Sequence, residues 1–167
     1  MPQELSSLLR QTIDRELPIL RDFPDPQSTV KPAGLDSWSP RQELGHLIDS
    51  AANNHIRFVR AATEPDFLGP GYAQNAWVDI HDYQQTPWGS IVDFWYQYNC
   101  FLAELLEKIP AEKLGTKCYI GNSPEATLGF VIEDYVVHMQ HHIDHLLARP
   151  VITVYPRQAV VQSTANV

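Results

Sequence analysis

The sequence has few cysteines and few basic residues for its length. Cys100 and Cys118 are the only cysteines among 167 residues, and they form no C-x-x-C pair, which favours a reducing compartment. Lys and Arg number 12 against 20 Asp and Glu, so the formal net charge is −8 with His neutral. Such an acidic chain is unsuited to a phosphate backbone or an anionic lipid surface. We therefore expect neither nucleic acid nor membrane as a partner.

Long apolar runs and N-terminal targeting signals are also missing. No segment approaches the roughly 18 apolar residues of a transmembrane helix, and the N-terminus has no basic stretch leading into an apolar one. We therefore expect a cytoplasmic protein. With 44% hydrophobic and 19% charged residues, the composition is that of a folded globular chain rather than a disordered one.

Four segments have apolar side chains at the spacing of three and four residues that predicts amphipathic helices: residues 3–23, 39–62, 86–109 and 127–149. Pro18 lies inside the first segment and should kink or shorten that helix. The pattern predicts an all-α fold, a four-helix bundle formed by residues 1–150. Residues 151–167 form a Val-rich C-terminal tail, either an extended arm on a partner subunit or a disordered end.

Local signals mark where two of these helices begin. Ser39-Pro40 is typical of an N-cap followed by the first helical residue, and Thr86-Pro87 repeats the arrangement. Between the long helices we expect one short helical turn within residues 72–80. One extended piece is expected at residues 117–120.

Four histidines fall within eight residues: His138, His141, His142 and His145. Residues four apart share a helix face, and the apolar pattern of this segment turns His138 and His142 toward the bundle interior. His141 projects with Asp134, away from the centre, and His145 lies at the margin. The inward pair has two interpretations. The two side chains are either ligands of a divalent metal, as His-x3-His spacing allows, or core histidines held by hydrogen bonds.

A polar stripe on the second helix offers a similar choice. His46, Asp49, Ser50, Asn53 and Arg57 lie opposite the apolar side of that helix. Taken alone, the stripe favours a solvated face. The alternative is the polar lining of a pocket between helices, with His46 as a metal ligand and the other side chains orienting it or contacting a substrate.

These motifs together resemble the DinB/YfiT-like superfamily, most closely its YfiT-like branch. The resemblance rests on the W-S-x6-H-x-x-D-S segment at residues 38–50 and on the H-x-x-H-H-x-x-H run at residues 138–145. Pro70-Gly71-Tyr72 with Trp77 is similar to the aromatic loop of that branch. Two features depart from it: Ala51 stands where the branch often has His, and the tail is longer.

The resemblance implies a four-helix bundle of DinB/YfiT type, here with a short extra helical turn and a C-terminal extension. It also implies a divalent metal held by His46, His138 and His142, with open positions for water or substrate. Three imidazoles suit several metals, of which we favour zinc or nickel. A homodimer is expected from the resemblance and from the hydrophobic tail.

Members of the family resemble either metal-dependent hydrolases or S-transferases that use bacillithiol or mycothiol. No carboxylate stands out in the sequence as a general base beside the three ligands. We therefore favour an enzyme that transfers a low-molecular-weight thiol to an electrophilic small-molecule substrate. One alternative is a hydrolase that uses a metal-bound water, and a further alternative is a metal-binding, stress-linked dimer without turnover.

Roles for the other polar residues follow from this expectation. Asp49 is a candidate base, or it orients His46. Asn53 is a candidate hydrogen-bond contact, and Arg57 suits a carboxylate on the thiol or substrate. Trp77 is a candidate wall of the cofactor pocket, as are Tyr83 and Trp88, although aromatic side chains at helical spacing more often belong to the core.

Overall fold

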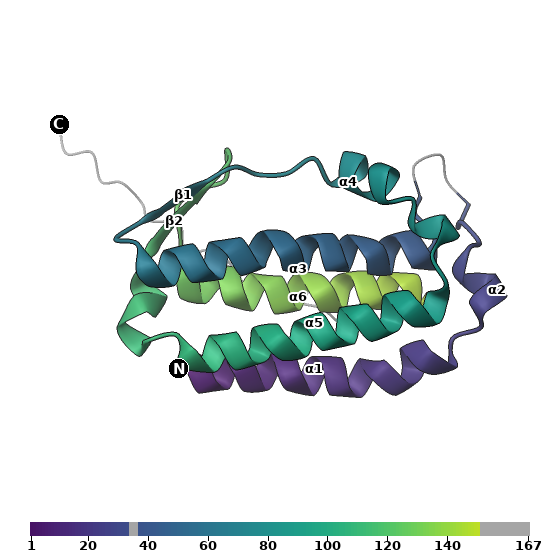
Figure 1. Cartoon of the computed structure of the whole chain (residues 1–167), viewed down its shortest axis with the longest axis horizontal. Coiled ribbons are helices and arrows are strands. Elements are labelled where there is room, and N and C mark those ends of the chain that lie inside the picture. The colour runs from purple at the N-terminus through teal and green to yellow at the C-terminus, as the bar shows by residue number, and fades with distance from the viewer. Residues whose placement is uncertain (34–36, 151–167) are drawn as a thin grey trace.

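The computed structural model describes residues 1–33 and 37–150, and four long helices dominate it (Figure 1). They are α1 (Pro2–Asp22), α3 (Pro40–Thr63), α5 (Trp88–Lys108) and α6 (Leu128–Leu146). Helix α1 contacts α5 and α6, and α3 contacts the same two helices, so the four close around one core. The predicted all-α four-helix bundle is confirmed. The tail at residues 151–167 lies outside the described residues.

Helix α1 runs through Pro18 to its predicted end, so the expectation that Pro18 shortens the helix is wrong. Pro18 lies on the exposed side of α1, as does Asp14, whose carbonyl loses its helical partner. That carbonyl can bind water instead. Leu20, in the last turn, is fully buried in the core and holds the end of the helix in place.

Helix α5 begins one residue later than the sequence suggests, because Pro87 rather than Thr86 is its N-cap. The carboxylate of Asp25, in the short helix α2 (Asp25–Ser28), accepts a hydrogen bond from the Trp88 backbone N–H at 3.2 Å. The Trp88 indole N–H donates to the Leu20 carbonyl at 2.8 Å. A distant segment therefore caps this helix, which a local sequence signal does not reveal.

A strap of residues 67–85 crosses the outer side of α3, with a small sheet at one end and α4 at the other (Figure 1). It comprises β1 (Phe67–Gly69), α4 (Gln74–His81) and a 3-10 turn (Tyr83–Gln85). A second 3-10 turn (Ala111–Gly115) follows α5.

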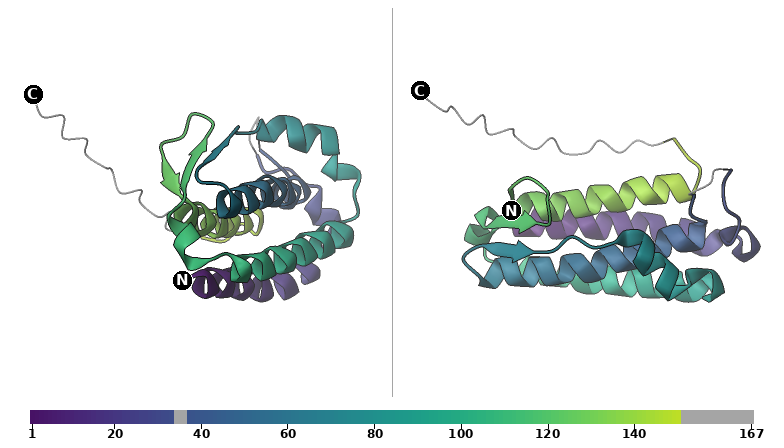
Figure 2. Two further views of the ribbon diagram at one scale, coloured as in Figure 1. Left: turned by 60° about the vertical axis from the view of Figure 1, so that its left-hand side comes forward. Right: turned by 90° about the horizontal axis from the view of Figure 1, so that it is seen from above.

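The sheet joins this strap to the segment before α6 (Figure 2). Strand β1 pairs in parallel with β2 (Lys117–Ile120), which pairs antiparallel with β3 (Ala126–Thr127). The extended piece at residues 117–120 and helical structure within residues 72–80 are as predicted. The sheet itself is not, because strands of two and three residues are too short to show a period of two.

The bundle core consists of aliphatic side chains from all four long helices and a few large aromatic ones. Trp88 and Trp95 of α5 are buried, whereas Phe94 and Phe101 of the same helix are more than half exposed. The aromatic richness of α5 thus serves the core on one side only. None of the described helices combines the length and the apolar character needed to cross a membrane.

Candidate metal centre and adjoining pocket

The start of α3 sets the direction of its polar side chains. Ser39 Oγ accepts a hydrogen bond from the Gln42 backbone N–H at 3.3 Å, and Gln42 Oε1 accepts one from the Ser39 N–H at 3.1 Å. From this start, side chains three or four residues apart point to one face: Glu43, His46, Ser50, Asn54 and Arg57. The polar stripe taken alone favoured a solvated face, but α6 and the strap cover this face of α3 and His46 is fully buried, in agreement with the alternative of a lining between helices.

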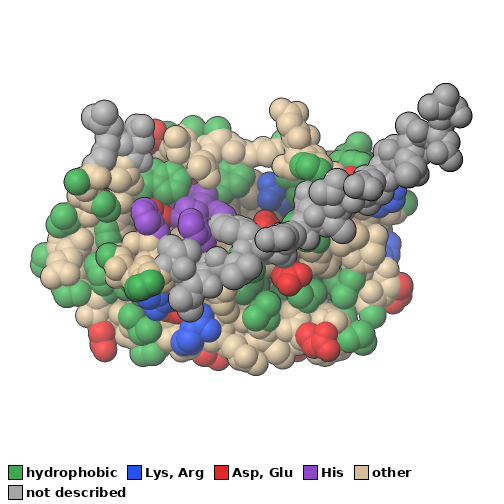
Figure 3. Space-filling model, turned by 180° about the vertical axis from the view of Figure 1, so that it is seen from behind, with side chains coloured by type: hydrophobic (Ala, Val, Ile, Leu, Met, Phe, Trp, Pro, Cys, Tyr) green, Lys and Arg blue, Asp and Glu red, His purple; other side chains and the backbone are tan. Residues whose placement is uncertain are grey.

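Three histidines from two helices meet at this face. His46 of α3 and His138 and His142 of α6 each offer a ring nitrogen, and these atoms all lie within 4.8 Å of one another. The closest pair is His46 Nε2 and His138 Nε2, at 3.3 Å. The Trp38 ring packs against His46 with its centroid 4.9 Å away. Histidine side chains gather in one patch on the back face of the molecule (Figure 3).

Burial keeps two of these imidazoles neutral. Burial and, to a smaller extent, the charge of His142 lower the pKa of His46 from 6.5 to about 4, although the charge of Glu43 opposes the shift. Burial and the charges of His142, His46 and His141 together lower the pKa of His138 from 6.5 to about 3. Both rings therefore hold a nitrogen lone pair at neutral pH, which is the form that binds a metal.

A buried carboxylate, Glu43, orients the third histidine. Its two oxygens accept hydrogen bonds from His142 Nδ1 at 2.5 Å and from His145 Nδ1 at 2.6 Å. Burial alone would raise the pKa of Glu43, but the hydrogen bonds and charges of His142 and His145 outweigh burial and lower it. With Nδ1 engaged, Nε2 is the nitrogen that His142 presents to the cluster.

Sequence reasoning missed Glu43, although its position three residues before His46 on the same face of α3 was a usable signal. It also left His145 at the margin of α6. The side chain of His145 is 54% exposed, and its Nδ1 hydrogen-bonds Glu43. His145 therefore lies between the buried Glu43 and the solvent.

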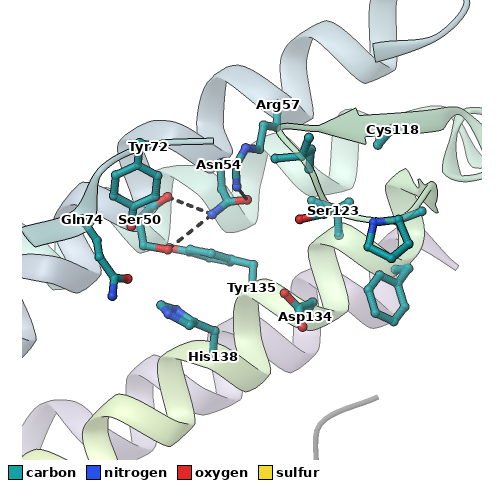
Figure 4. Close-up of a pocket in the computed structure, with 15 residues that line it drawn as sticks. Ser50, Asn54, Arg57, Tyr72, Gln74, Cys118, Ser123, Asp134, Tyr135 and His138 are labelled. Atoms are coloured by element: carbon teal, nitrogen blue, oxygen red, sulfur yellow. Dashed lines mark hydrogen bonds between the residues drawn. The ribbon is translucent and has the colours of Figure 1, made fainter. Parts of the chain in front are cut away.

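A pocket of about 490 Å³ opens beside His138 (Figure 4). Helix α3 contributes Ser50, Asn54 and Arg57, the strap contributes Tyr72 and Gln74, and α6 and the loop before it contribute the rest. The Asn54 amide donates to the Ser50 carbonyl at 2.9 Å and to Ser50 Oγ at 3.3 Å, and Arg57 Nη1 donates to Asn54 Oδ1 at 3.2 Å. A small molecule in this pocket would lie next to the histidine cluster.

The pocket holds one cation and one anion that are both half-buried. Burial lowers the pKa of the Arg57 guanidinium, and the charge of Asp134 opposes that shift. Burial raises the pKa of Asp134, and the positive charge of Arg57 opposes this rise. Asp134 was expected to point away from the bundle centre. It lines the pocket instead, because the loop between β2 and β3 and the strap enclose that side of α6.

Two further groups in the pocket stay neutral. Burial raises the pKa of the Cys118 thiol to about 11 and that of the Tyr72 hydroxyl to about 12. The Tyr72 ring stacks near His46, and its hydroxyl lies 3.5 Å from His46 Nδ1. Tyr72 therefore both lines the pocket and contacts His46 of the histidine cluster, and its hydroxyl is uncharged.

Asp49 lies outside this pocket. It is almost fully buried between α3 and the strap, its Oδ1 accepts a hydrogen bond from the Tyr83 hydroxyl at 2.6 Å, and His81 Nδ1 lies 2.9 Å from the same oxygen. Among the described residues, no hydrogen bond joins it to His46. Asp49 thus ties the strap to α3. Gly45 allows this arrangement, because a Cβ there would lie 2.2 Å from the Tyr83 ring.

The structure also places Asn53 and Trp77 away from the pocket. The Asn53 amide donates to the Asp49 carbonyl at 2.9 Å, and the neighbouring Asn54 takes the position at the pocket wall. One residue along a helix is a turn of about 100°, which the stripe pattern could not resolve. The Trp77 ring packs edge-on against the Tyr72 ring, at a centroid distance of 5.5 Å.

The donor set fits a divalent ion. Hydrogen bonding among three imidazole nitrogens that face one another leaves at least one lone pair without a partner, whereas one cation satisfies all three. Within residues 1–33 and 37–150, this trio is the one such cluster of potential ligands. Three imidazoles without a fourth protein ligand are typical of an open, catalytic type of site rather than a closed structural one.

The comparisons with known proteins agree with this geometry. The family model described as DinB superfamily matches residues 8–146, which is most of the chain. The chain belongs to the DinB superfamily. As a DinB protein, it is 31% identical over 111 residues to YfiT of Bacillus subtilis (strain 168), named "Putative metal-dependent hydrolase", covering 65% of this chain and 62% of YfiT. A protein of Bacillus mycoides (strain KBAB4) with the same description is 24% identical over 152 residues, covering 85% and 87% of the two chains.

Solved structures show the same fold. The structure of YfiT from Bacillus subtilis, described as having an unusual four-helix bundle topology, superposes with a TM-score of 0.76 at 22% identity, over 88% of this DinB chain and 84% of that one. A mycothiol-dependent maleylpyruvate isomerase superposes with a TM-score of 0.71 at 11% identity, over 87% and 60% of the two chains. At these identities the likeness concerns the fold alone.

Proposed function

We propose that this protein is a metal-dependent enzyme that transfers a low-molecular-weight thiol to an electrophilic small molecule. One observation carries the proposal: three imidazole nitrogens from α3 and α6 converge, and one of these histidines, His138, lines a pocket that also contains polar and charged side chains. The fold is shared with a mycothiol-dependent isomerase, which supports a role for a thiol.

The roles of the residues follow from their positions. His46, His138 and His142 would hold a divalent ion, for which zinc or nickel is our choice, and Glu43 would fix the orientation of His142. Arg57 would bind a carboxylate of the thiol or the substrate. The hydroxyls of Ser50 and Tyr72 lie between Arg57 and the histidines, where they can hydrogen-bond a bound molecule.

A bound divalent ion supplies Lewis acidity, which favours the deprotonated form of a thiol at neutral pH. In the transfer, the thiol sulfur forms a bond to an electrophilic carbon, the leaving group departs with its electron pair, and the thiol proton is lost to solvent. The pocket residues position both reactants. The half-buried site excludes much of the bulk water that competes with the thiol.

A thiol-consumption assay tests this proposal. The zinc-loaded or nickel-loaded protein is mixed with L-cysteine and the electrophile 1-chloro-2,4-dinitrobenzene, and the rate is compared with that of chelator-treated protein and of His138→Ala. We expect a metal-dependent rate that His138→Ala abolishes. Equal rates in all three samples would contradict thiol transfer.

Hydrolysis is the second candidate, because the curated relatives are named as metal-dependent hydrolases. A hydrolase would cleave p-nitrophenyl esters in the presence of metal and without any thiol. A protein that binds metal but accelerates neither reaction would instead be a metal-binding protein without turnover, the third interpretation.

We also infer a homodimer. Ile56 and Val59 of α3 and Phe94 and Phe101 of α5 are exposed apolar side chains on two helices that pack together, and such surfaces favour association. Light scattering tests this inference. A mass of twice the 19.0 kDa chain supports a dimer, and a mass equal to one chain rules it out.

A further inference from the structure

We propose that the pocket beside His138 binds a zwitterion: a small molecule with a carboxylate held by Arg57 and an ammonium group held by Asp134. An α-amino acid, or a compound with a free α-amino and carboxyl group, has this chemistry. The inference rests on the proposed function only in taking this pocket as the substrate site, and it adds Asp134 as a second charged anchor.

The pocket contains one positively and one negatively charged side chain, Arg57 and Asp134. Apart from His138 of the histidine cluster, the side chains that line it include one basic residue, Arg57, and one carboxylate, Asp134. Arg57 and Asp134 affect each other through charge at a distance, and no hydrogen bond or ion pair joins them within the described residues. Each is therefore half-buried without a charged partner in contact.

The two charged side chains come from different helices of the pocket wall. Arg57 enters the pocket from α3 and Asp134 enters it from α6, on opposite sides (Figure 4). Asp134 lies four residues before His138 and so one turn away on the same face of α6. A ligand held at its charged groups by Arg57 and Asp134 would extend its side chain along α6 toward the histidine cluster.

The opposite charges of Arg57 and Asp134 favour a ligand that carries both charges. A simple carboxylate would pair with Arg57 but would place a second negative charge near the half-buried Asp134, and a simple amine would have the mirror-image problem with Arg57. A zwitterion pairs both protein charges and leaves the pocket neutral. The neutral groups of Ser50, Asn54 and Gln74 remain as hydrogen-bond partners for the rest of the ligand.

The test uses three matched probes in which sulfur is blocked, so that binding does not depend on thiol chemistry. S-methyl-L-cysteine carries both charges, 3-(methylthio)propanoate lacks the ammonium, and 2-(methylthio)ethanamine lacks the carboxylate. Affinities for the full-length protein are measured by calorimetry or NMR titration before and after zinc loading. We expect S-methyl-L-cysteine to bind at least about tenfold more tightly than either truncated probe.

Variants separate the two anchors. Asp134→Asn should lower the affinity for S-methyl-L-cysteine about tenfold while leaving that for 3-(methylthio)propanoate equal or higher, and Asp134→Glu should restore part of the loss. Arg57→Gln should weaken both carboxylate probes. Circular dichroism on each variant shows that the bundle is intact.

Other outcomes overturn the inference. If Asp134→Asn binds S-methyl-L-cysteine as tightly as the wild type does, the pocket recognises a carboxylate alone. If none of the probes binds, the pocket does not recognise the amino-acid group. Because the probes are thioethers and are also tested without metal, these failures are distinct from a failure of thiol transfer, which the thiol-consumption assay detects.

Discussion

Glu43 is the side chain on which the orientation of His142 depends. Its two oxygens engage the Nδ1 atoms of His142 and His145, and its side chain is 5% exposed. The three histidines of the cluster were visible in the sequence as a motif. Glu43 was not, because a carboxylate on a helix face acquires this role only when another helix brings an imidazole to it.

We predict that Glu43→Gln lowers metal affinity by roughly 10–100-fold, the usual effect of losing a carboxylate that orients a ligating histidine. The amide can still accept one hydrogen bond but no longer stabilises both imidazole N–H groups by charge. Competition with a chelating dye measures the affinity. Glu64→Gln, at the exposed end of α3 where Glu64 pairs with Arg60, is the matched control and should bind metal like the wild type. Equal affinities for the wild type and Glu43→Gln would refute the role of Glu43.

The buried histidines predict a pH dependence of the metal-free protein. The folded-state pKa values of His46 and His138, about 4 and about 3, lie below the ordinary value of 6.5. Between these values the unfolded chain binds more protons, so the free energy of unfolding decreases as pH falls from 6.5 toward 4. Each pKa unit corresponds to roughly 1.4 kcal/mol.

Urea unfolding of chelator-treated protein at several pH values measures this dependence. The double variant His46→Gln/His138→Gln should have a flatter profile over the same range, because the titrating groups are gone. A profile as steep as that of the wild type would show that other groups cause the acid sensitivity.

At the scale of elements, the contacts of Asp49 in α3 with Tyr83 and His81 attach the strap that forms one wall of the pocket. Asp49 holds Tyr83 and His81 at the end of the strap, and the strap carries Tyr72 and Gln74 into the pocket wall. Asp49 therefore acts on the site through the strap. This role differs from the base or ligand-orienting role that the sequence suggested.

We predict that Asp49→Ala destabilises the protein by about 1–3 kcal/mol, because it removes the buried carboxylate to which the Tyr83 hydroxyl donates a hydrogen bond. Backbone amides of residues 67–81 should exchange hydrogen faster, while those of α1 should be unaffected. Asp49→Asn, which keeps an acceptor oxygen, should restore most of the protection. Unchanged exchange in the strap of Asp49→Ala would contradict this account.

The elements themselves were predictable to different degrees. Helix α3 could be located because its cap, Ser39, acts on a residue three positions away in the chain. Helix α6 could be located from the spacing of its apolar side chains. The start of α5 was placed one residue early, because Pro87 is its N-cap and the side chain that accepts from the Trp88 N–H, Asp25, belongs to another segment. The sheet could not be foreseen, since it depends on pairing between residues 67–69 and 117–120, and such non-local pairing leaves no periodic pattern.

At the scale of the whole molecule, two helices that are distant in sequence form one site. His46 and His138 are 92 residues apart, and packing of α3 on α6 brings their Nε2 atoms to 3.3 Å. Neither helix alone carries the three ligands. The inward direction of His138 and His142 could be read from periodicity, whereas the burial of His46 required the resemblance and then the structure, because its own helix offered a polar stripe.

Elemental analysis of protein purified without an affinity tag tests this central claim most directly. The wild type is measured beside His46→Ala and His138→Ala, with circular dichroism confirming that each variant is folded. The account predicts about one divalent ion per chain in the wild type and almost none in either variant. Retention of the ion in His46→Ala, or a wild type that takes up no metal after reconstitution, would contradict a metal site shared between α3 and α6.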